Sequence, residues 1–438
     1  MNERYRILGL ASARAAWFSD VARWATSAVI PAEFVKCVSP EEVRARLASG
    51  QQFSALLADA SLPSLDRDLV GTASDAGCAV VVVDDGRVAR DWAQLGVVAS
   101  LDGGFEASAL LSVLVDHARH LAGADTLPTD EATPTPVAGW RGRLVAVLGV
   151  AGSGASTCAI GIAQALAADV RYAGAVLLAD LRLHGDQAVL HDTGDVVPGV
   201  QELVEAHRAG RPRSDEIRTL THAVPDRGYE VLTGLRRHRD WAAMRERAFS
   251  AALDGLRSSY RLVVADAGCD VEGRAECGSL EVEERNLMAR RVTTEADVVV
   301  VVARPTVVGL RRLATALADL LDHGVEPGAL LPVLNQSPRN PAARAATSRI
   351  VAQLTATRRG RSGDQIELHP PLFLPHRGNV DDLHRDVAPL PRQLVAPLGR
   401  TVLPMVDRRE QAAPADDGGA DPVPITPGTI GHLTEAAS

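Results

Sequence analysis

Short hydrophobic runs alternate with segments of helical character along most of this chain. In the first part, the runs lie at residues 6–10, 33–38, 54–59, 79–84 and 97–101, and helix-like segments lie at 40–50 and 107–123. Further hydrophobic runs follow at 144–149, 175–180, 229–234, 261–266, 296–303 and 329–335. Continuous runs of this length are typical of strands buried on both faces of a parallel sheet. The sequence therefore predicts the α/β class, with two layered domains and helices on their sheets.

Changes in composition indicate where these domains begin and end. The segment from 121 to 139 is rich in Pro, Thr and Ala and has no apolar periodicity, as is typical of linkers. From residue 407 onward too few apolar residues remain to offset the entropy cost of ordering. We predict a first domain at 1–121, a linker at 122–140, a second domain at 141–406 and a disordered acidic tail at 407–438.

Length, charge and cysteine content narrow the class of protein. With 438 residues, 46% of them hydrophobic, the chain is long enough for more than one core. No stretch reaches the roughly 18 apolar residues that span a bilayer, and the N-terminus lacks the pattern of a signal peptide. We expect a cytoplasmic protein without a direct membrane anchor. The five scattered cysteines show no metal or redox spacing, and the net charge of −9 disfavours general binding to nucleic acid.

A glycine-rich segment, GVAGSGAST, follows the run at 144–149 and precedes a predicted helix. Glycines let the backbone turn its N–H groups toward phosphate oxygens, and the helix N-terminus adds partial positive charge. Measured against G-x-x-x-x-G-K-[ST], Ala155 stands at the lysine position, and Lys36 is the only lysine in the chain. We predict an anion-binding loop formed by Gly149, Gly152, Ser153, Gly154, Ala155, Ser156 and Thr157.

This loop resembles the deviant phosphate loop of the MinD/ParA family of P-loop ATPases, GKGGxGKT. Val150 stands where that family carries its second, signature lysine. Asp180, after the run at 175–180, stands where the family carries the first of two water-positioning acids, whereas Arg182 stands in place of the second. The resemblance implies a catalytic role for Asp180 and, with both lysines lost, weak or absent hydrolysis.

Three further positions follow the order of the same family. Asp266, after the run at 261–266, resembles the Walker B acid, so the resemblance implies that Ser156 and Asp266 coordinate Mg²⁺ beside ATP or ADP. Asn335 stands where the family carries the asparagine that reads adenine. Pro375 lies in PLFLPHRGNV, which is similar to the loop that closes over the base.

The first domain is similar to response-regulator receivers, which have a flavodoxin-like fold. Asp59 stands at the end of the third strand, where receivers are phosphorylated. Receivers also need an acidic pair after the first strand, a hydroxyl after the fourth and a lysine after the fifth. Ala11 and Ser12, Asp84 and Gly103 stand at these positions, so metal binding and charge neutralisation are compromised. We predict a pseudo-receiver that docks partners and is not phosphorylated.

Together the two domains resemble the CpaE/TadZ branch of the MinD/ParA family, including homologues described as septum-site-determining proteins. The resemblance implies a nucleotide-binding spatial regulator that forms a homodimer. It also implies protein partners such as a pilus or secretion ATPase, or a polar or septal factor, and recruitment to the pole or septum.

Two other functions stay open. The first is an active ATPase in which Arg182, Arg143 or an arginine of a partner replaces the missing lysines. The second is DNA partitioning, which the acidic net charge disfavours because nonspecific DNA binding needs a cationic surface. The acidic segment at 269–286 is longer than a short switch loop requires, and is either a partner site or a solvated insertion.

Overall fold

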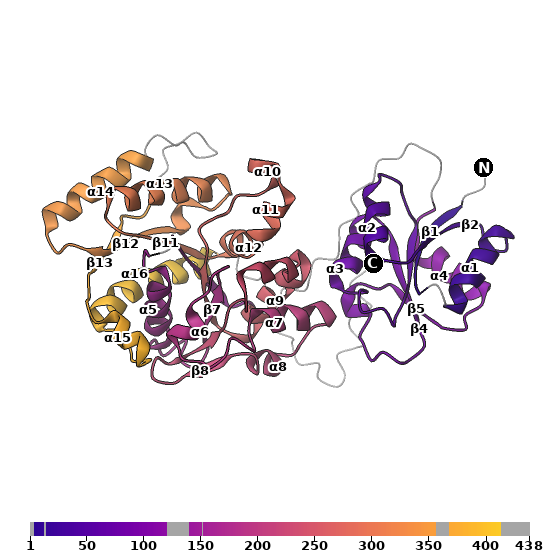
Figure 1. The fold of residues 1–438 in the computed structure, drawn as a ribbon, viewed down its shortest axis with the longest axis horizontal. Coiled ribbons are helices and arrows are strands. Elements are labelled where there is room, and N and C mark those ends of the chain that lie inside the picture. The colour runs from indigo at the N-terminus through magenta and orange to yellow at the C-terminus, as the bar shows by residue number, and fades with distance from the viewer. Residues whose placement is uncertain (1–3, 13–14, 121–139, 151, 356–367, 413–438) are drawn as a thin grey trace, which may run out of the picture.

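The computed structural model describes residues 4–12, 15–120, 140–150, 152–355 and 368–412, which form two β-sheets with helices on both faces (Figure 1). The predicted α/β class and the two layered sheets are confirmed. Nearly all of the predicted linker at 122–140 lies outside the described residues, as does the part of the predicted tail beyond residue 412.

The first sheet is parallel and has the strand order β2-β1-β3-β4-β5, which is the predicted flavodoxin-like order. Its core lies on both faces: α2 and α3 pack on one, and α1 and α4 on the other. The elements are β1 (Tyr5–Leu10), α1 (Ala16–Thr26), β2 (Ala32–Cys37), α2 (Pro40–Ala48), β3 (Ala55–Asp59), α3 (Arg67–Asp75), β4 (Ala79–Asp84), η1 (Ala93–Leu95), β5 (Ala99–Asp102) and α4 (Ala107–His117).

The second sheet has the order β13-β12-β11-β6-β10-β7-β9-β8, and its strands are parallel except for β8 at one edge. Sequence reasoning missed the two edge strands, β8 and β13, which are only three and four residues long. The strands are β6 (Arg143–Gly149), β7 (Val176–Leu181), β8 (His222–Val224), β9 (Tyr229–Leu232), β10 (Leu262–Ala267), β11 (Val298–Ala303), β12 (Leu330–Ser337) and β13 (Leu372–Pro375).

Helices cover both faces of this sheet. One face carries α5 (Ala155–Ala167), α15 (Val380–Arg385) and α16 (Arg392–Ala412). The other carries α7 (Val200–Ala209), α8 (Ser214–Arg218), α9 (Glu246–Ser259), α12 (Leu287–Glu295), α13 (Val307–Asp322) and α14 (Pro341–Thr355). Shorter elements are α6 (Gln187–Leu190), η2 (His238–Ala243), α10 (Arg274–Cys277), α11 (Leu280–Arg285) and η3 (Pro327–Ala329). No helix in the described ranges is both long and apolar enough to cross a membrane.

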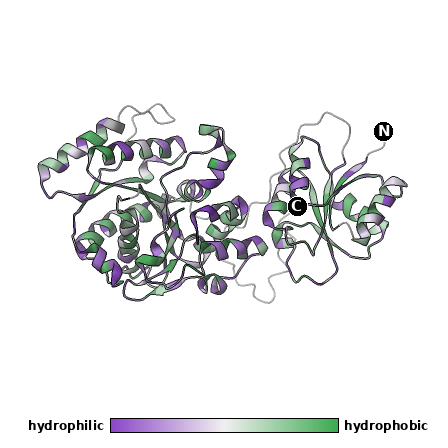
Figure 2. Cartoon of the chain, in the orientation of Figure 1, coloured by the Kyte–Doolittle hydropathy of each residue, from purple (hydrophilic) through white to green (hydrophobic). Residues whose placement is uncertain are grey.

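Alternation along each central strand supplies both cores at once. In β6, Leu144 and Leu148 face one cluster, whereas Val145 and Val147 face the other, and all four are fully buried. Figure 2 shows the hydrophobic residues on the strands and the hydrophilic ones on the outer sides of the helices. Burying one such side chain stabilises the fold by about 1.5–3 kcal/mol. The well-packed middle strands therefore hold the loops at their carboxyl ends in fixed positions.

Helix α16 corrects the predicted start of the acidic tail. It continues to Ala412, although the tail was predicted from residue 407. The helix buries Leu398, Met405 and Val406 on the α5 side of the sheet, and Asp407 accepts a hydrogen bond from Arg171 at 3.0 Å. The apolar residues that order it lie earlier in the helix, so the composition of the following segment did not reveal its end.

The first domain contacts the second through α3, which lies against α7 and α9 (Figure 1). Arg67 donates from Nε to the backbone oxygen of His207 at 3.0 Å. From the other side, the backbone N–H of Arg247 donates to Asp68 Oδ1 at 3.2 Å, and its guanidinium pairs with Asp75. This contact is polar and charged, so we expect it to be sensitive to charge and salt.

Reversing the charge at position 247 is expected to separate the domains. In Arg247→Glu a carboxylate would lie beside Asp68 and Asp75, and each like-charge contact at such a surface costs about 0.5–1 kcal/mol. Small-angle scattering of the full chain should give a larger radius of gyration for Arg247→Glu than for the wild type. Arg312→Ala, at an exposed position on α13, is the control. An unchanged radius for Arg247→Glu would contradict a contact held by these charges.

Candidate functional site

The glycine-rich segment forms a tight turn between β6 and α5. Gly152 and Gly154 have φ values of 78° and 83°, in the left-handed region that favours glycine. Gly154 is the residue before α5, so the turn directs the first N–H groups of a 13-residue helix toward the carboxyl edge of the sheet. Ala151 lies outside the described residues. This conformation suits an anion, because the N–H groups at a helix start have no acceptors within the helix.

The Asn335 side chain holds this turn in place through a hydrogen bond to its backbone. Its Nδ2 donates to the backbone oxygen of Ser153 at 3.0 Å, and its Oδ1 accepts from the backbone N–H of Gln336 at 2.8 Å. A Cβ atom at Gly154 would clash with the same amide. Both ends of the Asn335 side chain are therefore engaged with the backbone in this structure. One N–H and one oxygen lone pair of the amide remain, and the role implied by the resemblance, reading adenine, stays a prediction.

The hydroxyl of Ser153 is a buried polar group of the loop that has no partner among the described residues. Ser153 is only 2% exposed, and its Oγ has no hydrogen-bond partner among the described residues. It lies beside Gly149, where an added Cβ would meet it. Since buried hydroxyl groups nearly always find a partner, this Oγ indicates that the loop is built to receive a polar ligand.

Asp180 lies at the end of β7, and its surroundings do not suit the predicted catalytic role. The carboxylate is 1% exposed and accepts the backbone N–H groups of Arg182 at 3.3 Å and Gln187 at 3.0 Å. Gly185 and Gly234 enclose it so closely that a Cβ at either position would meet it. Burial, and secondarily the nearby Asp266, raise the pKa of Asp180. The side chain holds the turn after β7 in place and has no access to a water in bulk solvent.

Asp266, at the end of β10, is fully buried and engaged by side chains from both neighbouring segments. Arg182 Nη1 donates to Oδ1 at 3.2 Å, and Gln187 Nε2 donates to Oδ2 at 2.8 Å. The Ser156 hydroxyl, from the first turn of α5, lies close enough to the carboxylate to lower the pKa of Asp266. Burial raises the pKa of Asp266, and the Arg182 guanidinium opposes that shift.

The predicted magnesium site can be tested against these contacts. Ser156 and Asp266 do lie together, as the motif order required. Both carboxylate oxygens, however, already accept N–H donors, and one donor is a cation that would repel a divalent ion. No group of three His, Cys, Asp or Glu side chains suited to a metal occurs in the described part of the chain. The side chains as they lie do not fit Mg²⁺.

Arg182 bridges the ends of three strands. Besides Asp266 on β10, it donates from Nη1 to the oxygen of Ala267 at 3.2 Å and from Nη2 to the oxygen of Gly149, at the end of β6, at 3.1 Å. It follows β7 directly, and its side chain is 16% exposed. The guanidinium thus lies between the glycine-rich loop and Asp266, in a part of the chain that has no lysine.

The remaining predicted residues lie around the loop with different roles. Ala155 is buried at the start of α5, so its methyl packs into the core where a lysine would reach outward. Thr157 faces away from the loop, and its Oγ1 lies 3.1 Å from His384 Nε2. Pro375 ends β13 and pairs with Ser337, so the first part of PLFLPHRGNV is an edge strand, and the predicted role of Pro375 beside a base stays a prediction.

Sequence reasoning missed Gln187 and His384. Gln187 is fully buried and ties Asp180 to Asp266, with its Oε1 unpartnered among the described residues. Its only signal was its place shortly after a strand end, in a polar stretch. His384 reaches the site from α15, which is more than two hundred positions along the chain, and no local pattern marks it.

The N-terminal Asp59 is also engaged locally. Its Oδ1 accepts from the backbone N–H of Ser61 at 2.9 Å and from the Ser61 hydroxyl at 2.6 Å, and Trp17 Nε1 donates to Oδ2 at 3.4 Å. Asp84, after β4, accepts from Trp92 Nε1 at 2.9 Å. Each acid is therefore held by hydrogen bonds from its own turn and from a tryptophan.

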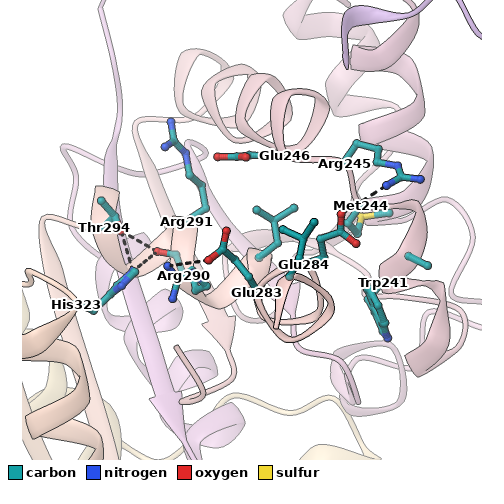
Figure 3. A pocket seen from close by; sticks show the side chains of 13 residues that line it. Trp241, Met244, Arg245, Glu246, Glu283, Glu284, Arg290, Arg291, Thr294 and His323 are labelled. Atoms are coloured by element: carbon teal, nitrogen blue, oxygen red, sulfur yellow. Dashed lines mark hydrogen bonds and ion pairs between the residues drawn. The ribbon is translucent and has the colours of Figure 1, made fainter. Parts of the chain in front are cut away.

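A hollow lies away from the glycine-rich loop, beside the acidic segment at 269–286. It encloses about 230 Å³ between η2, the start of α9, α11 and α12 (Figure 3). Its lining combines acidic and basic side chains, and Arg290 and Arg245 pair with Glu283 and Glu284. With its charges paired internally, this hollow has no excess of positive charge for a phosphate group.

Comparison with known proteins gives similarity in structure only. No family model matches the chain, and no curated protein matches it. A ParA family ATPase from Chlorobium tepidum TLS has a TM-score of 0.45 and 17% identity, covering 60% of this chain and 98% of that one. The cell division ATPase MinD from Pyrococcus furiosus has a TM-score of 0.42 and 15% identity, covering 62% and 100%. At such identities and TM-scores the likeness carries no conclusion about function.

Stability should depend on pH through His384. Burial, and secondarily Arg227, lower the pKa of His384 to about 4, although Asp381 opposes the shift. Because this pKa lies below the unfolded value, the contribution is complete above about pH 6.5 and is lost as pH falls toward 4. Replacing the histidine should reduce the loss of unfolding free energy over this window by roughly 1–3 kcal/mol.

Urea unfolding of His384→Gln and wild type across this pH window measures the difference. Glutamine keeps a hydrogen-bonding group for Thr157 and does not titrate. His117→Gln, at an exposed position on α4, should follow the wild type. If wild type and His384→Gln lose stability in parallel, His384 is not held neutral by the fold.

Proposed function

We propose that this chain is a nucleotide-dependent spatial regulator of the MinD/ParA type, which binds ATP or ADP at the loop of residues 149–156 and hydrolyses ATP weakly or not at all. The observation that carries the proposal is the loop itself: two left-handed glycines before α5, with the buried, unpartnered hydroxyl of Ser153 between them. Its position also supports a ligand site, because β6 is central and the chain runs to opposite sides of it.

Weak hydrolysis follows from the surrounding side chains. Phosphoryl transfer relies on positioned cations and on a residue that orients the attacking water. Ala155 and Val150 leave the loop without lysine. Asp180 is enclosed by its own turn, and Asp266 is occupied by Arg182 and Gln187. Binding of nucleotide needs none of these acids, whereas activation of water does.

The proposed biological role also includes binding to partner proteins. In the proposed organisation, the pseudo-receiver of residues 1–121 and the P-loop domain of residues 141–406 act together, as in the CpaE/TadZ branch. The protein forms a homodimer and recruits a pilus or secretion ATPase, or a polar or septal factor, at the pole or septum. The support is the order of motifs and the flavodoxin-like first sheet, whose Asp59 and Asp84 are bound locally.

Calorimetric titration of the full chain with ATP, beside a phosphate-release assay, tests this function. The wild type should bind ATP and release phosphate at the background rate. Gly154→Ala should bind at least about tenfold more weakly, because its methyl displaces Asn335 and strains a left-handed residue.

Gly278→Ala is the matched control, because that glycine has φ 74° but open space around it, away from the loop. It should lose stability but keep its affinity. A wild type that binds no ATP would refute nucleotide binding at this loop. Phosphate release that disappears in Asp266→Ala would replace the proposal with the active-ATPase alternative.

A further inference from the structure

The cation beside the phosphate loop is a side chain of the protein itself, Arg182. Arg182 contacts Gly149, Asp266 and Ala267 at 3.1–3.2 Å, so it joins the loop to the acid that would otherwise face a metal ion. Three of its N–H groups are used in these bonds, and a guanidinium has five. The remaining donors have no partner among the described residues, so they are available for phosphate oxygens.

The same contacts occupy the oxygens of the Asp266 carboxylate, so these oxygens are not free to coordinate a metal ion. A magnesium ion needs near-octahedral oxygen ligands at short distance, and in nucleotide sites it combines a carboxylate with phosphate oxygens. Here Oδ1 of Asp266 accepts from Arg182 and Oδ2 accepts from Gln187, whose own position is set by Asp180 through the backbone. To bind the ion, the chain would have to break this buried network and leave the Arg182 guanidinium without its carboxylate partner.

We propose that Arg182 takes the place of both the loop lysine and the divalent ion, so that the phosphate groups of ATP or ADP bind at this loop without magnesium. This inference rests on the proposed function, because it concerns the same loop. The ligand class is a free nucleoside di- or triphosphate, bound by the N–H groups at the start of α5, by the Ser153 hydroxyl and by the guanidinium. Arg182 is then a phosphate-binding residue, and Asp266 orients it.

The small positive charge of this site makes any bound phosphate depend on Arg182. In a site with its lysine and a divalent ion, three positive charges oppose one acidic side chain and the phosphates. Here Arg182 supplies one, balanced by Asp266, and burial favours the neutral form of Asp180. Free ATP carries more negative charge than its magnesium complex, so it depends more on the guanidinium and the loop N–H groups. The site should therefore be sensitive to Arg182 and insensitive to the ion.

The test compares ATP affinity in EDTA and in excess MgCl₂, using calorimetry on the full chain. For the wild type, the affinities should agree within about threefold. Arg182→Ala should bind ATP at least about tenfold more weakly in EDTA and recover part of the loss with MgCl₂, because Asp266 is then open to the ion. Arg182→Lys, which keeps the charge, should lose less than Arg182→Ala in EDTA. Arg312→Ala, on the exposed side of α13, should match the wild type.

Thermal unfolding with MgCl₂ alone gives a readout that needs no nucleotide. Added MgCl₂ should leave the wild-type midpoint unchanged and raise that of Arg182→Ala, which also shows whether this variant folds. Wild-type binding that weakens tenfold or more in EDTA would overturn the inference while leaving the proposed function intact, and so would tighter binding by Arg182→Ala in EDTA. A wild type that binds ATP in neither buffer would overturn the proposed function as well.

Discussion

The buried ion pair between Arg182 and Asp266 is the interaction on which the arrangement of the site depends. It joins β7 to β10, and the second bond of the guanidinium to Gly149 extends the connection to β6. An ion pair of this kind adds little net stability, since desolvation offsets attraction, but removing one partner typically costs 3–5 kcal/mol. The pair therefore acts chiefly by specifying one arrangement of the three strand ends beneath the loop.

The polar groups around that pair divide into those that hold the backbone and those that face a ligand. Asp180 and Asn335 form hydrogen bonds to backbone groups of turns. Asp180 holds the turn after β7, and Asn335 holds the glycine-rich loop. Ser153 and Arg182 have hydrogen-bonding groups beside the start of α5 that no described residue uses. A site with rigid supports and free donors suits binding and conformational signalling. The loop has no lysine and Asp180 is enclosed by its own turn, and the proposed weak turnover is argued from these two observations.

Much of the fold could be predicted from the sequence, because central strands such as β4, β6 and β11 are buried and appear as nearly uninterrupted hydrophobic runs. The edge strands β8 and β13 could not, since they are short and bury less. The motif order located the loop, Asp180 and Asp266 correctly at one edge. It could not show that Arg182 lies across Asp266, or that Gln187 completes the network, because side-chain direction is set by packing between segments far apart in the chain.

A crystal structure of the full chain with ADP, grown without divalent ions, tests the central claim most directly. The account predicts that the terminal phosphate lies against the N–H groups at the start of α5, within hydrogen-bond distance of Ser153 Oγ and the Arg182 guanidinium, with Asp266 still paired. ADP bound elsewhere, such as in the hollow beside Trp241, would contradict it. So would Arg182 turned away from a phosphate that occupies the loop.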